Sequence, residues 1–178
     1  MAIRDIHILG SPVLRHRAEE IETVDDEVRA LVEDLFDTMA AASGVGLAAN
    51  QIGVTRRVAV INADGQTFAM INPRIVEAEG RDAKEEGCLS IPEAFAEVTR
   101  PERIVLEALN EQGDLIRIDA SALVARAVQH ELDHLDGVLF IDHLSPLKRQ
   151  LLVSRWKKDH RNEPLTRTPR PEEPEEKA

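Results

Sequence analysis

Two histidines four residues apart enclose a glutamate in the run His130-Glu131-Leu132-Asp133-His134. Residues four apart share one face of a helix, so both imidazoles can bind a single metal ion. Glu131 then lies close enough to take a proton from a water molecule on that ion. The spacing therefore predicts a hydrolytic metal site, and the alternative is a chance pattern on a solvated helix face.

The third ligand does not follow the common peptidase patterns. The metzincin continuation of the motif requires a histidine at the position of Phe140. A thermolysin-like site takes a glutamate from a later helix, but the next glutamate, Glu163, stands at the edge of a proline-rich tail. Cys88 is the only cysteine, so it cannot form an internal disulfide. The simpler interpretation is that Cys88 is a small buried hydrophobic residue. As a thiolate beside two imidazoles, it would complete a catalytic three-ligand site with one open position.

The segment around the motif is predicted to be a helix because good helix formers surround it. A second, amphipathic helix is predicted over residues 26–42, where apolar side chains recur at i, i+3 and i+4. Its apolar stripe is typical of a face packed on a core. Residues suited to the helix ends are Asp119 or Ser121 before the motif helix, Gly137 after it, and Asp25 or Thr23 before the first helix.

Between these helices the pattern changes to that of strands. Asp64-Gly65 is a hairpin turn, Asn110–Asp114 is a second turn, and Pro101 indicates an edge or a bulge. This order predicts an α+β fold, with mixed or antiparallel β-sheets packed around a central metal-binding helix, an N-terminal helix and a C-terminal helix. Extended apolar segments are expected at 58–61, 68–71, 75–78, 104–108 and 115–118.

The chain is expected to hold one catalytic domain, residues 1–161, followed by a disordered tail, residues 162–178. The tail contains four of the nine prolines and a run of glutamates. Residues 146–161 are predicted as a further helix with six basic residues against one acid, Asp159. The simpler interpretation is that these charges only form the solvated surface of a terminal helix.

Composition restricts the class of protein. The net charge of −11 argues against generic nucleic-acid binding, so DNA is not expected as a partner. The chain has no stretch of 18 apolar residues that could cross a membrane. Its start lacks the layout of a secretory signal, and one unpaired cysteine suits a reducing compartment. We therefore expect a cytoplasmic protein.

Three separate stretches together resemble the motifs of the peptide deformylase family. The run Gly44-Val45-Gly46-Leu47-Ala48-Ala49-Asn50-Gln51 is similar to its glycine-rich motif, G-x-G-L-A-A-x-Q. The run Glu86-Gly87-Cys88-Leu89-Ser90 is similar to its E-G-C-L-S motif, and His130–His134 to its H-E-x-D-H motif. The three occur in the family's order and spacing, and the resemblance extends from about residue 3 to about residue 150.

The resemblance implies an enzyme that removes the formyl group from the N-terminal formyl-methionine of new polypeptides. It implies that Cys88, His130 and His134 bind the metal and that Glu131 is the general base. The backbone N–H of Leu89 and the side-chain amide of Gln51 would stabilise the oxyanion.

The resemblance also implies that the peptide adds as a β-strand beside Val45, Gly46 and Gly87. Leu123 and Ala127 are candidates for the wall of a methionine pocket, and plain core packing is the alternative for both.

The family points to Fe²⁺ as the working ion, although Cys and His ligands leave Zn²⁺, Ni²⁺ and Co²⁺ open. It also implies ribosome contact through the basic helix 146–161. The rival interpretations are an H-E-x-x-H zinc peptidase, which would cut internal peptide bonds, and a structural metal domain, which would unfold without its metal.

Overall fold

A computed structural model describes residues 2–170 of the chain. Within these residues the α-helices are α1 (Asp26–Ala41), α2 (Ala122–Leu135) and α3 (Pro146–Asp159). The strands are β1 (Ile6–His7), β2 (Gly46–Ala48), β3 (Val58–Ala63), β4 (Gln66–Glu79), β5 (Asp82–Cys88), β6 (Ile91–Arg100), β7 (Arg103–Leu109), β8 (Leu115–Ser121) and β9 (Thr166–Arg167). Short 3-10 turns lie at Pro12–Arg15, Ala49–Ile52 and Phe140–His143.

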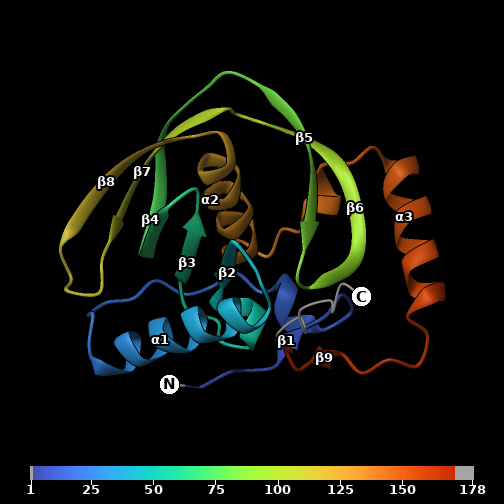
Figure 1. Ribbon diagram of the computed structural model, residues 1–178, viewed down its shortest axis with the longest axis horizontal. Helices are drawn as coiled ribbons and strands as arrows, with labels where there is room; N and C mark the ends of the chain where they lie inside the picture. The colour runs from blue at the N-terminus through green and yellow to red at the C-terminus, as the bar shows by residue number, and fades with distance from the viewer. Residues whose placement is uncertain (1, 171–178) are drawn as a thin grey trace, which may run out of the picture.

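The strands form three antiparallel sheets around α2. A five-stranded sheet has the order β2-β3-β4-β7-β8, and two-stranded sheets are formed by β5-β6 and by β1-β9. Figure 1 shows α2 at the centre, between the five-stranded sheet and the β5-β6 pair, with α1 below β2 and β3. The α+β fold with a central motif-bearing helix, predicted from the order of elements, is confirmed.

The first hairpin and the first helix form where their local signals predict. Asp64 and Gly65 both have positive φ, 48° and 75°, as a tight hairpin turn between β3 and β4 requires. The side chain of Asp25 accepts a hydrogen bond from Val28 N at 3.0 Å and caps α1. The apolar stripe of α1, which includes Leu31 and Leu35, is buried in the core.

Two strand predictions need correction. Residues 75–78 are not a separate strand, because β4 continues from Gln66 to Glu79 through two register shifts. Strand β5 was missed, since Lys84 and Glu85 give it a charged, exposed pattern without apolar alternation. Its position is fixed by pairing along most of β6.

Helix α2 packs an apolar face on the five-stranded sheet and ends abruptly. Ser121 occupies the N-cap position, but its side chain makes no capping hydrogen bond. Asp119 lies in β8, so it is not the cap. Past the other end, Gly137 adopts φ +75°, as predicted for a helix stop. A Cβ built there would lie 2.6 Å from the carbonyl oxygen of Arg15.

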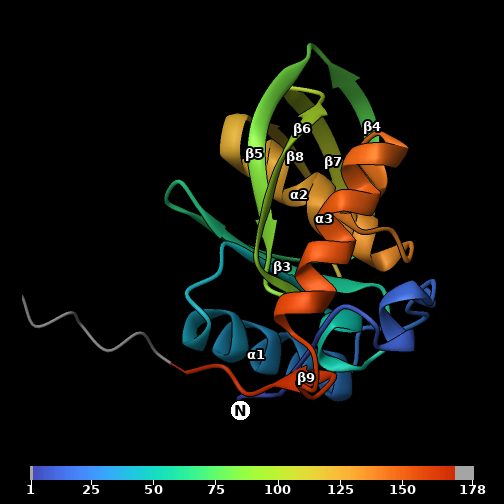
Figure 2. The ribbon, with the colours of Figure 1, turned by 90° about the vertical axis from the view of Figure 1, so that its right-hand side faces the viewer.

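The C-terminal region also differs from the prediction. Helix α3 ends at Asp159, and Figure 2 shows it running along the outside of β5 and β6. The chain does not become a tail at 162, because β9 pairs with β1. Residues 171–178 lie outside the described residues, so disorder there stays a prediction. No helix within residues 2–170 is long and apolar enough to cross a membrane.

The two glycines at φ +75° give a matched test of the end of α2. Gly137→Ala and Gly65→Ala both place a Cβ at positive φ, at a cost of about 1 kcal/mol. A Cβ at Gly65 meets nothing within 4 Å, whereas one at Gly137 overlaps Arg15. We therefore expect Gly137→Ala to lower the free energy of unfolding by at least about 1 kcal/mol more. Urea unfolding measures both losses, and equal losses would contradict the packing described here.

Candidate active site

Three atoms able to bind a metal meet where β5 ends beside α2. Cys88 Sγ lies 3.3 Å from His134 Nε2, which lies 3.2 Å from His130 Nε2. The ligand atoms of these three residues all lie within 4.8 Å of one another. Ligands at about 2.0–2.3 Å around a tetrahedral ion stand about 3.3–3.7 Å apart. The donor set and its spacing therefore fit one divalent metal ion.

The buried carboxylate of Glu86 orients His130. Its Oε1 lies 2.8 Å from His130 Nδ1 and accepts from Arg100 at 2.9 Å. Its Oε2 accepts from Arg100 Nε at 2.6 Å and from Arg126 at 2.5 Å. Burial alone would raise the pKa of Glu86, but hydrogen bonds from His130 and Arg100 outweigh it and bring the pKa to about 2. Because this carboxylate can only accept, His130 Nδ1 carries the proton and Nε2 faces the site.

Asp133, the other acid of the motif helix, extends the same network. It accepts from Arg100 at 2.9 Å and lies 2.7 Å from His143 Nε2. Arg100 therefore joins Asp133 on α2 to Glu86 on β5. The pairs fix the face of α2 that carries both histidines relative to the strand that carries Cys88.

The two histidines differ in their electrostatic surroundings. Burial and the nearby His130 lower the pKa of His134 well below its usual range, which leaves it neutral. Burial also lowers the pKa of His130, but hydrogen bonds with Cys88 and Glu86 outweigh burial and raise it well above the usual range. A metal ion would replace the proton on His130 Nε2, since metal ligation requires the neutral imidazole.

Glu131 is directed into the site from between the histidines. Glu131 is only 3% exposed, and its Oε2 has no hydrogen-bond partner among the described residues. Burial raises the pKa of Glu131 to about 7, against the lowering effect of His130 and Arg100. Gly46 faces it so closely that a Cβ there would lie 2.7 Å from Glu131 Oε1. Glu131 is thus a buried carboxyl group able to bind or release a proton near neutral pH.

Gln51 is held with its amide nitrogen toward the sulfur. It lies in the 3-10 turn Ala49–Ile52, and its Oε1 accepts from Ala48 N at 3.0 Å. That bond turns Nε2 toward Ser90 Oγ at 3.1 Å and Cys88 Sγ at 3.9 Å. A buried donor fixed in this way is suited to a developing negative charge beside the ligand atoms.

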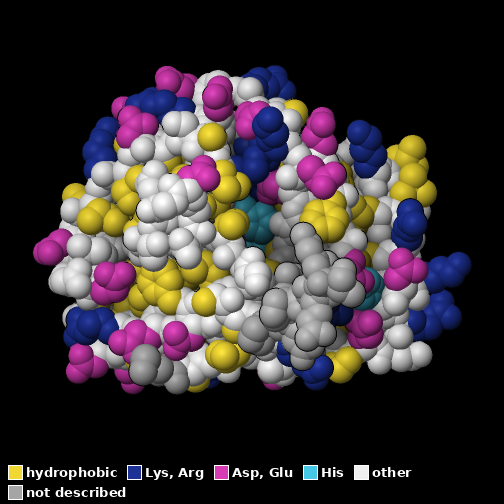
Figure 3. Space-filling view, viewed as in Figure 1, with side chains coloured by type: hydrophobic (Ala, Val, Ile, Leu, Met, Phe, Trp, Pro, Cys, Tyr) yellow, Lys and Arg dark blue, Asp and Glu magenta, His cyan; other side chains and the backbone are white. Residues whose placement is uncertain are grey.

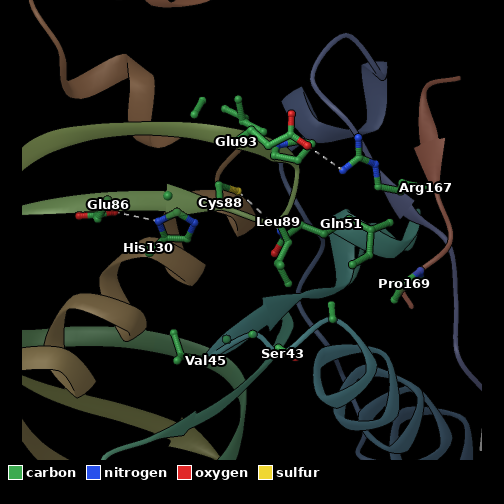
Figure 4. Close-up of a pocket in the computed structure, with 18 of the residues that line it drawn as sticks. Ser43, Val45, Gln51, Glu86, Cys88, Leu89, Glu93, His130, Arg167 and Pro169 are labelled. Atoms are coloured by element: carbon green, nitrogen blue, oxygen red, sulfur yellow. Dashed lines mark hydrogen bonds and ion pairs between the residues drawn. The ribbon is translucent and has the colours of Figure 1, made fainter. Parts of the chain in front are cut away.

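A cavity of about 1030 Å³ opens onto these groups. Figure 3 shows a hollow on this face with a histidine side chain at its centre. Figure 4 shows His130 and Glu86 on one side of Cys88, with Gln51 on the other. His134 is buried behind the cavity, while the other predicted site residues line it: Val45, Gly46, Gln51, Gly87, Cys88, Leu89, Leu123, Ala127, His130 and Glu131.

Sequence reasoning missed several residues of the site. Arg126 stands four residues before His130 on the same helical face, a spacing that could have indicated it. Arg100 pairs with Glu86 across 14 positions and gives no local signal. Phe95 also lines the cavity and is exposed, and a Cβ on Gly87 would lie 2.6 Å from its ring. The C-terminal residues 163–170, apart from Leu165, line the cavity as well, although we expected them in a tail.

Comparison with known proteins identifies the family of this site. The sequence profile of the family described as Polypeptide deformylase matches residues 3–150, which include all three motifs. The chain belongs to the polypeptide deformylase family. A peptide deformylase of Phenylobacterium zucineum is 49% identical over 164 residues, which cover 89% of this chain and 97% of that relative.

Solved deformylase structures share the fold. The peptide deformylase of Legionella pneumophila superposes with a TM-score of 0.85 at 44% identity, covering 90% of this chain and 96% of that one. That of Ehrlichia chaffeensis in complex with actinonin gives a TM-score of 0.85 at 38% identity, covering 90% and 99%. These deformylase relatives give no support to the zinc peptidase alternative.

Proposed function

We propose that this chain carries out its reaction in the cavity beside Cys88, His130 and His134. As a peptide deformylase, the chain is a hydrolase that removes the N-formyl group from the N-terminal formyl-methionine of new polypeptides, with release of formate. The observation that carries the assignment to this cavity is the convergence of three ligand atoms with Glu131. We infer that residues 2–170 act as one catalytic domain, in the cytoplasm, where a free thiol stays reduced.

We assign Cys88, His130 and His134 as the metal ligands. Peptide deformylases are metalloenzymes, and the ion expected here is Fe²⁺, with Zn²⁺, Ni²⁺ and Co²⁺ as alternatives for the same donors. The bound ion supplies positive charge that polarises the formyl carbonyl and lowers the pKa of water. The short distances between the ligand atoms support this assignment.

Glu131 is assigned as the proton-transfer group. Its unpartnered Oε2 can accept a proton from the attacking water and return it to the leaving amine. A pKa of about 7 suits both steps near neutral pH, and a nearby cation would lower this value. Gln51 Nε2 and the backbone N–H of Leu89 are the proposed donors to the carbonyl oxygen as it gains negative charge.

The walls of the cavity are assigned to the peptide. Val45 and Gly46 lie on one wall and Gly87 on the other, so an extended substrate can pair with both backbones. Leu123, which is 41% exposed, and Ala127 are proposed to contact the methionine side chain. A formylated end carries no ammonium charge, so it can enter the cavity without the cost of desolvating one.

Glu131→Gln is expected to keep the metal and to lower kcat on the order of 10²-fold or more, since the amide cannot accept the proton. Formate release from a formyl-Met tripeptide and metal content are measured on the same sample. The matched control is Glu33→Gln on the exposed face of α1, which should change neither. Loss of metal together with activity in Glu131→Gln would show that the role is misassigned.

Cys88→Ser is expected to weaken metal binding by at least about 10-fold, because the hydroxyl is a poorer ligand than a thiolate. The fold should persist by circular dichroism, since Cys88 is half-buried and small. The weakening of metal binding is measured as the metal content that remains after dialysis against a weak chelator. Because Cys88 is the only thiol, its protection from a thiol reagent by bound metal provides a second reading. Equal metal retention in the mutant would remove Cys88 from the site.

Ribosome contact through α3 is a further part of the proposal. Lys148, Arg155, Lys157 and Lys158 are exposed on this helix and available to phosphate groups. Arg149 is less available, because it forms an ion pair of 3.1 Å with Asp142. Fewer basic side chains of α3 are therefore available to the ribosome than the number of basic residues in 146–161 suggested.

Charge reversal tests this contact. Lys148→Glu with Arg155→Glu should abolish ribosome co-sedimentation at low salt and spare hydrolysis of a free formyl-Met tripeptide. The control, Arg81→Glu with Lys84→Glu, makes the same change of charge on exposed positions of the β4–β5 region. The salt dependence of wild-type binding should have a slope of about one per phosphate contact. Equal co-sedimentation of both variants would leave α3 as a solvated surface.

A further inference from the structure

A segment far from the three motifs reaches the same cavity. Residues 163–170, here called the C-terminal strap, lie beyond α3 and line the cavity with all members except Leu165. Figure 4 shows Arg167 and Pro169 across the cavity from His130, with Cys88 between them. The cavity, at about 1030 Å³, is as large as pockets that enclose drug-sized ligands, and it exceeds the needs of a formyl-methionyl group.

The strap is fixed in place by backbone and side-chain bonds to the start of the chain. Strand β9 pairs with β1, with Arg167 opposite Ile6. Ile8 N donates to Leu165 O at 2.8 Å, and Thr168 Oγ1 donates to Asp5 Oδ1 at 2.7 Å. These contacts hold the strap along one side of the cavity.

Glu93, near the start of β6, fastens the strap to that strand. Its carboxylate lies 3.8 Å from Arg167 and 3.2 Å from His160 Nε2, at the end of α3. Glu93 has φ +67°, a backbone conformation that residues other than glycine rarely adopt. Such strain persists only where the surroundings compensate it. Here the carboxylate joins β6, α3 and the strap at the cavity.

Within the described residues one edge of β9 is unpaired, and both residues of the strand line the cavity. Among residues 2–170 its only sheet neighbour is β1. The bond from Ile8 N to Leu165 O makes the next pair, His7 with Thr166, a non-hydrogen-bonded pair. The backbone N–H and C=O of Thr166 therefore point away from β1, and Thr166 lines the cavity. An edge of this kind can receive an extended peptide.

We propose that the C-terminal strap binds the nascent polypeptide downstream of its formyl-methionine, by pairing with the open edge of β9. This inference rests on the proposed function, because it assigns a further part of the same substrate. It predicts that the strap contributes to KM for longer peptides and leaves the chemical step unchanged. A strap that only fastens the N-terminal strand would not distinguish peptides by length.

The test compares two substrates in each variant: a formyl-Met-Ala amide and a formyl-Met pentapeptide amide. Their kcat/KM ratio does not depend on the fraction of active enzyme. A chain cut after Asn162 lacks the strap, and a chain cut after Arg170 keeps it. We expect the first cut to lower the ratio of pentapeptide to dipeptide about fivefold through KM, the effect of about one net hydrogen bond. The second cut should leave the ratio unchanged.

Point variants keep the test decisive if the shorter chain does not fold. Arg167→Ala removes the contact with Glu93 and should lower the ratio, whereas Arg81→Ala, at an exposed position between β4 and β5, should not. An unchanged ratio in Arg167→Ala and in any active chain cut after Asn162 would overturn the proposal. Failure of the wild type to hydrolyse either substrate would instead overturn the proposed function.

Discussion

The structure depends on one fully paired buried carboxylate. Glu86 receives four donors, from Arg100 twice, Arg126 once and His130 once, which is the capacity of a carboxylate group. Removal of one partner from such a buried charge network typically costs about 3–5 kcal/mol. The same carboxylate sets the tautomer of His130, a proposed metal ligand, and joins β5 to α2. Stability of the core and geometry of the site are therefore not separable at this residue.

The parts of the site that could be predicted depend on residues only a few positions apart in the sequence. His130 and His134 are one helical turn apart, and Gly137 ends their helix at positive φ, so the helix and the shared face of its two histidines followed from local rules. The hairpin at Asp64-Gly65 and the cap at Asp25 followed in the same way. The motif resemblance supplied Gln51 and Leu89, which local physics alone would have left as ordinary polar and apolar residues.

The missed parts depend on partners distant in the sequence. Strand β5 carries charged residues that are stabilised by pairing with β6, so its own composition does not indicate a strand. Strand β9 is two residues long and exists through contact with β1, some 160 positions away. The proline-rich composition indicated a tail from residue 162. Composition alone cannot show that β9 pairs with β1, which lies in the N-terminal segment. Arg100 was missed for the same reason.

Pairing of the first strand with the last affects how this enzyme is made. A ribosome synthesises β1 long before β9, so β1 must wait for its partner while about 160 further residues are added. Contacts of such high sequence separation form slowly, because loop closure must be achieved before they contribute. Most of the core, including α1, α2 and the motif-bearing strands, can assemble earlier. The cavity is therefore expected to gain the wall formed by the strap only after the rest of the core has assembled.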